Sequence, residues 1–215
     1  MATYMQNLIN SKPPGLFILA IEGIDFSGKT TLAHQIQSSL ITQSYRVKLL
    51  HDPKGSKNAQ VIWNTILTLK EQGADAITEF FLFLAARHEL ISKEVSAGDF
   101  DVIIFDRFIF STIAYQLTHQ PDYWSPFLTT HGIFSRLMPD LCIYCDVDFP
   151  TFELRSQARN KQDRFDQMSQ HRFEAIKAAY EQTLNLNVCP YLRIDEEYNN
   201  REMVMKRIVR ELAIK

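Results

Sequence analysis

Five short segments of this chain consist almost entirely of β-branched and large apolar residues, and longer stretches with helical periodicity lie between them. The segments are Leu16 to Glu22, Tyr45 to His51, Asp101 to Asp106, Leu141 to Val147 and Tyr191 to Asp195. Runs such as "VIIF" have no polar face, which is typical of strands buried on both sides within a parallel sheet. The pattern predicts an α/β fold in which helices cover both faces of a five-stranded parallel sheet, a three-layer α/β/α arrangement.

Two parts of the chain depart from this pattern. Pro13, Pro14 and Gly15 punctuate the start of the first strand, so we expect residues 1–14 to form an arm and residues 15–215 to form a single domain. The segment Arg155 to Gln170 is polar and has no apolar stripe that could face a core. It fits either a solvated surface helix or a small lid, which we place at about residues 153–170.

The composition is ordinary for a globular protein and narrows the classes of partner. The net charge of -2 gives no broad positive field for a nucleic-acid polymer or an anionic membrane. The N-terminus lacks a signal-peptide pattern and no apolar run approaches the length of a membrane span, so we expect a cytoplasmic protein. Cys142 and Cys145 lie in a predicted strand, where residues three apart point to opposite faces, and we assign them no metal or redox function.

A phosphate-binding pattern, G-x-x-x-x-G-K-[ST], follows the first predicted strand. Glycine lets backbone N–H groups point into a concavity, the lysine brings a positive charge to the terminal phosphates, and the Thr30 hydroxyl can bind magnesium. A helix that begins near Lys29 adds the positive end of its dipole. The predicted nucleotide-binding residues are Gly23, Ile24, Asp25, Phe26, Ser27, Gly28, Lys29, Thr30 and Thr31.

Two further strings, "DPKG" at residues 52–55 and "NKQD" at residues 160–163, spell the remaining motifs of a GTPase switch. A guanine-reading motif should follow a buried strand, where its side chains are held against the base. Here "NKQD" follows a helical, basic stretch, and "DPKG" comes directly after the second predicted strand. The positions of both strings therefore argue against a GTPase.

Several motifs, in the same order along the chain, resemble those of thymidylate kinases. They are "EGIDFSGKTT", "FLFLAARHEL", "DRFIFSTIAYQ", "PDLCIYCDV" and "DRFDQ", within about Phe17 to Tyr180. The resemblance implies a P-loop kinase with strand order 2-3-1-4-5 that uses ATP and Mg²⁺ to phosphorylate dTMP to dTDP, in dTTP synthesis. It also implies a homodimer formed through helices that flank the sheet, for which the apolar stretch "ITEFFLFLAA" is the candidate surface.

Candidate residues for the acceptor nucleotide lie in the later motifs. Phe83 and Arg87 are four apart and share a helix face, and the resemblance implies that Phe83 stacks on thymine while Arg87 reads its exocyclic oxygen. Asp106 and Arg107 end a buried strand, where ligands of open α/β sheets gather, so Asp106 can hold magnesium through water and Arg107 can fork onto the acceptor phosphate. The resemblance adds Ser111, Tyr115 and Gln116 around the base and sugar, Tyr115 against a ribose 2′-hydroxyl, and Asp25 at the sugar 3′-hydroxyl.

Phosphoryl transfer also requires cations around the migrating group. The phosphate loop itself offers only Lys29, because Phe26 stands where some thymidylate kinases carry arginine. Arg155 and Arg159 are four apart on a predicted helix, which resembles the bacterial-type arrangement in which the lid supplies the catalytic arginine. The candidate catalytic residues are Lys29, Arg107, Arg155 and Arg159.

The chain departs from the family pattern after the second predicted strand, where "HDPKGS" replaces an Arg-Glu-Pro-Gly-Gly-Thr run. Asp52 keeps a carboxylate on the acceptor side, whereas His51 replaces an arginine and Lys54 replaces a glycine near the expected acceptor phosphate. Two alternatives stay open: a P-loop kinase for another nucleotide or nucleoside, and a catalytically weak nucleotide-binding protein used for interaction. The acceptor-side cations argue against the second.

Overall fold

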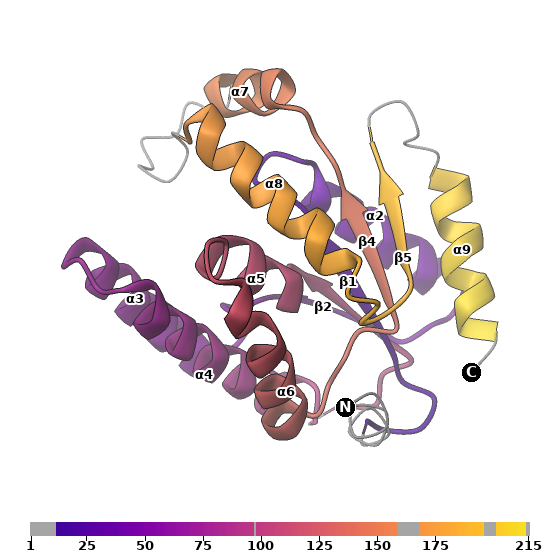
Figure 1. Cartoon of the computed structure of the whole chain (residues 1–215). Helices are drawn as coiled ribbons and strands as arrows, with labels where there is room; N and C mark the ends of the chain where they lie inside the picture. Colours follow the sequence, from indigo (N-terminus) through magenta and orange to yellow (C-terminus); the bar gives the residue numbers. More distant parts are fainter. Residues whose placement is uncertain (1–11, 97, 159–167, 196–200, 214–215) are drawn as a thin grey trace.

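A parallel sheet forms the centre of the computed structural model, which describes residues 12–96, 98–158, 168–195 and 201–213 (Figure 1). Its strands are β1 (Phe17–Glu22), β2 (Val47–His51), β3 (Val102–Asp106), β4 (Leu141–Cys145) and β5 (Tyr191–Ile194). They are ordered β2-β3-β1-β4-β5, and each neighbouring pair is parallel. The predicted strands and their order are confirmed, with ends that differ by one or two residues.

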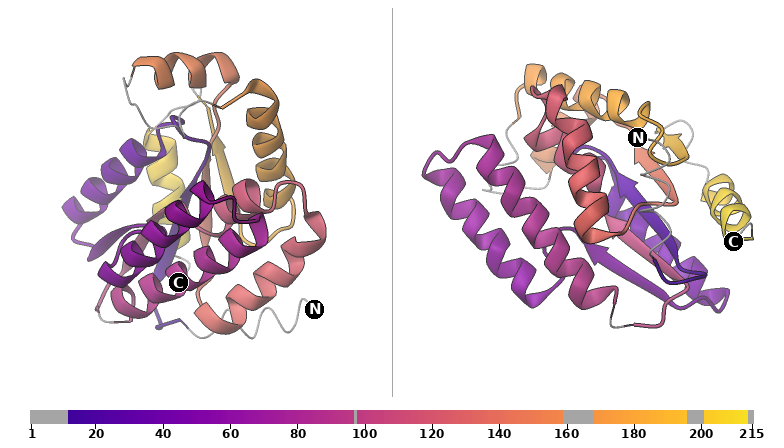
Figure 2. Two further views of the ribbon diagram at one scale, coloured as in Figure 1. Left: turned by 90° about the vertical axis from the view of Figure 1, so that its left-hand side faces the viewer. Right: turned by 60° about the horizontal axis from the view of Figure 1, so that its bottom comes forward.

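Helices cover both faces of the sheet, so the predicted three layers are confirmed. The helices are α2 (Lys29–Thr42), α3 (Lys57–Glu71), α4 (Ala76–Glu94), α5 (Ile109–Gln116), α6 (Trp124–Ser135), α7 (Phe149–Ala158), α8 (Gln170–Leu184) and α9 (Arg201–Ala213), with a 3₁₀ turn at Pro121–Tyr123. Helices α2 and α9 contribute to the core on one face, whereas α4, α5, α6 and α8 contribute to the core on the other. Helix α3 lies beside α4, as the two views of Figure 2 show.

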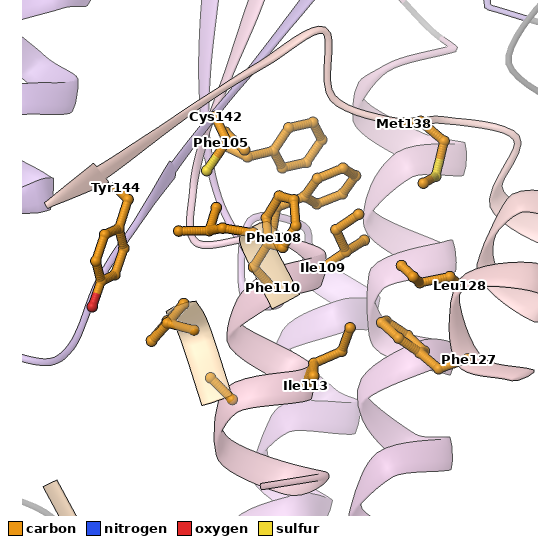
Figure 3. Close-up of a cluster of buried hydrophobic side chains, with 14 of the residues drawn as sticks. Phe105, Phe108, Ile109, Phe110, Ile113, Phe127, Leu128, Met138, Cys142 and Tyr144 are labelled. Carbon is orange, nitrogen blue, oxygen red and sulfur yellow. The ribbon is translucent and has the colours of Figure 1, made fainter. Parts of the chain in front are cut away.

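Alternation along the strands separates two apolar cores. In β1, Phe17, Leu19 and Ile21 belong to the core under α2 and α9, while Ile18 and Ala20 belong to the larger core on the opposite face. Figure 3 shows part of this larger core, where residues of β3, α5 and α6 meet. In β4, the buried free thiols of Cys142 and Cys145 fall into opposite cores, as expected for strand residues three apart.

The loops that follow β1, β2 and β3 meet at one edge of the sheet. Because the strands are parallel, their carboxyl ends all lie at this edge, where His51 and Ile21 flank Asp106 in register. The sheet therefore brings the phosphate loop, the "HDPKGS" segment and the Asp106-Arg107 pair together. Among the residues that the structure describes, no helix has both the length and the apolar character needed to cross a membrane.

Candidate active site

The phosphate loop between β1 and α2 has backbone positions that require glycine. A Cβ atom on Gly23 would lie 2.4 Å from the carbonyl oxygen of Cys145, because the loop passes close to the end of β4. Gly28 precedes α2 with a φ of 87°, in the left-handed region that glycine adopts without steric cost. The two glycines of the motif thus allow the tight path that leads into the start of α2.

Lys29, the first residue of α2, is buried beneath this loop. Its Nζ donates a hydrogen bond to the carbonyl oxygen of Ile24 at 3.2 Å and lies 3.8 Å from Oδ1 of Asp25. Burial, together with the nearby charge of Arg107, lowers the pKa of Lys29 to about 8. A buried ammonium group is stabilised by a nearby anion, so the arrangement favours a bound phosphate.

Thr30 and Asp106 are adjacent, as a magnesium site requires. The Thr30 hydroxyl donates to Oδ2 of Asp106 at 2.6 Å, and Nδ1 of His51 lies 3.1 Å from the same oxygen. Burial acts to raise the pKa of Asp106, but the hydrogen bonds from His51 and Thr30 outweigh it and the pKa is lowered. Oδ1 of Asp106 is buried and has no hydrogen-bond partner among the described residues, so an ionised carboxylate oxygen is available to a cation. These oxygens fit Mg²⁺, which takes hydroxyl and carboxylate ligands together with water and phosphate.

Arg107 directly follows β3 and connects the phosphate loop to α5. Its φ of 69° is unusual for a side chain of this size and marks a position that the surrounding contacts hold in place. The guanidinium group forms an ion pair with Asp25 and donates to the Gly23 carbonyl oxygen at 3.2 Å and to the Ser111 hydroxyl at 3.3 Å. It also lies over the Tyr115 ring, 5.0 Å from the ring centre.

Asp25 is turned toward α5, which explains how an acid is accommodated in a loop for anions. The Tyr115 hydroxyl donates to Oδ2 of Asp25 at 3.0 Å and accepts from the Asp25 backbone N–H at 3.1 Å. Burial opposes ionisation of this carboxyl group, but the neighbouring charges of Arg107 and Lys29 outweigh it and hold its pKa well below the usual range. Asp25 is therefore an ionised carboxylate that faces Tyr115 and Arg107.

A buried carboxylate, Glu22, fixes the start of α5. Its Oε1 accepts hydrogen bonds from the backbone N–H groups of Phe108, Phe110 and Ser111 at 2.8, 3.1 and 3.2 Å. The Ser111 hydroxyl donates to Oε2 of Glu22 and is 2.8 Å from the Tyr180 hydroxyl, which lies 3.2 Å from the Gly23 carbonyl oxygen. Ser111, predicted at the substrate, is thus part of a buried network that links β1, α5 and α8.

Arg87 and Asp52 form a buried ion pair beneath the expected base pocket. Nε of Arg87 donates to Oδ2 of Asp52 at 2.8 Å, and Nη2 donates to the Thr112 hydroxyl at 2.6 Å and to the Phe108 carbonyl oxygen at 3.1 Å. Asp52, predicted to bind substrate, therefore holds Arg87. Nη1 of Arg87 and Oδ1 of Asp52 are buried without hydrogen-bond partners among the described residues, which leaves one donor and one acceptor for a ligand.

Phe83, one turn before Arg87 on α4, is half-buried against α3. Its ring is 5.7 Å from the ring of Trp63 in a T-shaped arrangement. Nζ of Lys54 lies 4.6 Å from the centre of the Trp63 ring. Trp63 therefore lies between Lys54, the lysine that departs from the family pattern, and Phe83, the residue predicted to stack on the base.

Of the other predicted residues, Arg155, Gln116 and Thr31 lie in the described part of the chain. Nη1 of Arg155, on α7, donates to the carbonyl oxygen of Phe26 at 3.0 Å, so this arginine lies at the tip of the phosphate loop. Gln116 is the last residue of α5, and Thr31 lines a hollow of about 600 Å³ between α2 and α9. Arg159 and the whole "NKQD" string lie outside the described residues.

Sequence reasoning missed several residues that hold the site together, namely Glu22, Trp63, Thr112, Phe152 and Tyr180. Polar residues within apolar stretches were one usable signal, because a buried acid or hydroxyl needs a partner. Glu22 at the end of an apolar strand and Thr112 within "FSTIA" both fit that description. Trp63 and Phe152 carry no such signal, since aromatic residues at helical spacing are ordinary core residues.

Comparisons with known proteins agree with this geometry. The sequence model of the family described as thymidylate kinase matches residues 21–208. The thymidylate kinase of Mesoplasma florum is 32% identical over 76% of this chain and 80% of its own length. That of Ruegeria pomeroyi is 32% identical over 87% of this chain and 84% of its own length. The crystal structure of thymidylate kinase from Ehrlichia chaffeensis has a TM-score of 0.69 at 25% identity and covers 91% of this chain and 99% of that one. This chain belongs to the thymidylate kinase family.

Proposed function

We propose that the protein transfers the γ-phosphate of ATP to dTMP, forming ADP and dTDP, with Mg²⁺ at Thr30 and Asp106. The observation that carries this proposal is the ion pair between Arg107, which follows β3, and Asp25 of the phosphate loop, because it places an arginine beside the donor loop at the carboxyl ends of the strands. A protein that only binds a nucleotide has no need of a half-buried arginine at this position.

The proposed roles follow from what each group can reach. The N–H groups of the loop and Lys29 hold the donor phosphates, and Arg107 orients the acceptor phosphate. An oxygen of that acceptor phosphate attacks the γ-phosphorus while the bond to the β–γ bridging oxygen breaks, and ADP leaves with the electron pair. Mg²⁺, when bound, would neutralise charge on the β- and γ-phosphates. Arg155 and Arg159 supply positive charge at the migrating group, because Lys29 is the one cationic residue within the phosphate-loop motif itself.

We assign selection of the acceptor nucleotide to residues of α4 and α5, together with Asp52 and Asp25. Phe83 stacks on the base, and Arg87 donates a hydrogen bond from Nη1 to the exocyclic oxygen. Asp52 fixes the orientation of Arg87. Tyr115 would crowd a ribose 2′-hydroxyl, which favours a deoxynucleotide. Asp25 accepts a hydrogen bond from the sugar 3′-hydroxyl. Ser111 and Gln116 complete the sugar side, Ser111 through its contact with Arg107.

Three broader expectations belong with this proposal. Residues at about 153–170 act as a lid whose closure excludes water, a competing phosphoryl acceptor. The enzyme works in the cytoplasm. A second copy of the chain packs on α3 and α4, where the side chains of Val61 and Phe81 are 62% and 59% exposed. A Phe81→Glu variant that stays as dimeric as the parent in light scattering would rule out this dimer surface.

A coupled assay of ADP release tests the reaction itself. The protein is supplied with ATP and Mg²⁺ and, separately, with dTMP, dUMP, dCMP, dGMP, AMP or thymidine. We expect the highest kcat/KM with dTMP and no turnover in excess chelator. A higher kcat/KM with another acceptor would overturn the assignment of dTMP as the substrate. Absence of turnover with every acceptor would favour the binding-protein alternative.

A further inference from the structure

Phe26, at the tip of the phosphate loop, has a backbone conformation that its side chain disfavours. Its φ is 63°, in the left-handed region where a bulky residue is rare and where glycine fits without cost. Such a position persists only when surrounding contacts hold it. A phenylalanine in this place therefore calls for contacts that a glycine could not make.

The ring of Phe26 makes such contacts with the helices that border the proposed lid. It lies 5.6 Å from the ring of Phe152 on α7, in a T-shaped geometry, and Phe152 is only 2% exposed. Phe152 lies 5.2 Å from Phe173 on α8, and Phe149 lies 5.4 Å from the same ring. The tip of the loop thus joins an aromatic cluster, Phe26, Phe149, Phe152 and Phe173, that connects it to α7 and α8.

The backbone of Phe26 makes a second contact with the same helix. Its carbonyl oxygen accepts a hydrogen bond from Nη1 of Arg155 at 3.0 Å. Arg155 follows Phe152 by three residues, so the two side chains project from the same face of α7. Ring and carbonyl of one residue therefore hold one face of α7 against the loop.

We infer that Phe26 is a positioning residue that docks α7 on the phosphate loop through Phe152 and so places the Arg155 guanidinium beside the donor phosphates. This inference deepens the proposed function, since it assigns a role to a residue within that site. It also explains why the loop carries a phenylalanine where some relatives carry arginine: the ring attaches a helix that brings the positive charge. The competing explanation is that the ring only fills space in the core.

Two substitutions of Phe26, one that removes the aromatic ring and one that keeps it, test the inference. Phe26→Leu keeps an apolar Cβ-bearing residue at the strained position, and Phe26→Tyr keeps the ring. Phe149→Leu is the matched control, because Phe149 belongs to the same cluster and helix but contacts Phe152 and Phe173 instead of Phe26. Loss of a T-shaped pair corresponds to roughly a three- to tenfold change in an equilibrium, so we expect kcat to fall by that factor in Phe26→Leu with the KM for dTMP unchanged. Phe26→Tyr should restore kcat, and Phe149→Leu should change it less than twofold.

A second readout does not depend on activity. Amide hydrogen exchange of the ligand-free protein should be faster in α7 for Phe26→Leu, while α5 and α9 keep the exchange of the parent. Equal protection of α7 in the parent and in Phe26→Leu would overturn the docking role, and so would faster exchange throughout the chain, which would mean simple core filling.

The link to Arg155 is tested by combining substitutions. If Phe26 acts through Arg155, Arg155→Ala should lower kcat less in the Phe26→Leu background than in the parent. Additive losses would contradict the inference. If the parent protein phosphorylates none of the acceptors, the proposed function is contradicted. The hydrogen-exchange experiment would still report on the docking of α7.

Discussion

Arg107 and Arg155 lie beside the same loop, but the protein holds them by different kinds of contact. Arg107 is embedded at the junction of β3 and α5, where it meets Asp25, the Gly23 carbonyl oxygen, Ser111 and the Tyr115 ring. Burial opposes the charge on Arg107, yet the adjacent Asp25 outweighs this and raises the pKa of Arg107 well above its usual value. The junction is a network of directional, charge-assisted contacts.

Arg155 is exposed on α7, and that helix meets the loop mainly through rings. Its described contact with the loop is one hydrogen bond to a backbone oxygen, beside the T-shaped contact of Phe26 with Phe152. Aromatic contacts of this kind are individually small and tolerate changes of geometry.

The difference in contacts predicts which part of the site is the more rigid. Separating Arg107 from Asp25 would leave a partly desolvated charge without its partner, so the β3–α5 junction resists change. Separating Phe26 from Phe152 breaks an uncharged ring contact, so we expect the contact between α7 and the loop to break at a smaller cost. Under the proposed function, a preorganised acceptor side and a lid side that can detach would suit phosphoryl transfer, which needs fixed charges and a site that opens for exchange of nucleotides.

Substitution of Arg107 should give the largest effect. We expect Arg107→Ala to lower kcat/KM for dTMP by roughly 10³-fold, because it removes the acceptor-side cation and leaves Asp25 without its main partner. Arg107→Lys keeps a charge but loses the planar fork, so it should recover only part of the activity. Steady-state kinetics measure both variants, and full activity of Arg107→Lys would show that a point charge is sufficient.

Substitution of Arg155 should affect a different kinetic constant. We expect Arg155→Ala to lower kcat by roughly 10²-fold and to change the Kd of ATP by less than about threefold, because a lid cation acts on the migrating group rather than on binding. Gln157→Ala, at another exposed position of α7, is the control and should match the parent. Equal losses in kcat and in ATP affinity would place Arg155 with the binding residues. The same kcat loss is expected for Arg159→Ala.

Much of the region around Arg107 was predictable from the sequence, whereas the contact between α7 and the phosphate loop was not. Asp106 and Arg107 could be placed because a buried strand with two charged residues at its carboxyl end has few explanations in an α/β fold. The five strands followed from apolar runs, and their lengths were nearly right because burial on both faces leaves a clear pattern.

The remaining features depend on contacts between segments distant in sequence. Asp52 was expected at the substrate, and only the tertiary arrangement, which brings the segment after β2 beside α4, reveals that it pairs with Arg87. Phe26 had no explanation at all, since its partner Phe152 is 126 positions away along the chain and has an ordinary helical environment. Residue type and spacing report on local chemistry, whereas pairing between rings depends on the tertiary arrangement.

Two carboxylates accept hydrogen bonds from backbone N–H groups at the start of a helix, one at α5 and one at α7. Their contributions to the free energy of unfolding test the comparison between the two regions. Glu22 is buried and accepts three N–H groups at the start of α5, whereas Asp148 is exposed and accepts from the Thr151 N–H at 2.9 Å in the first turn of α7. We expect Glu22→Gln to lower the free energy of unfolding by about 2 kcal/mol, because an amide donates where the site needs acceptors. Asp148→Asn should cost less than about 0.5 kcal/mol, since asparagine is an equally good cap. Urea denaturation measures both, and equal losses would remove the energetic distinction between the two helices.

Leaving aside the comparison variants, the smallest expected effect concerns Tyr180, through which α8 touches both regions. Helix α8 contacts the aromatic cluster through Phe173 and the polar network through the Tyr180 hydroxyl, which is 2.8 Å from Ser111 Oγ and 3.2 Å from the Gly23 carbonyl oxygen. Tyr180→Phe keeps the ring and removes only these hydrogen bonds, so we expect a loss of about 1 kcal/mol in the free energy of unfolding.

Tyr144→Phe is the control for this substitution, because its ring lies 5.2 Å from that of Tyr180 and its hydroxyl makes no hydrogen bond within the described part of the chain. We expect the control to match the parent in stability. If Tyr180 serves only the fixed network, Tyr180→Phe should leave hydrogen exchange in α7 unchanged. Faster exchange in α7 would mean that the two regions are coupled through α8, and the lid side would then not be independent of the acceptor side.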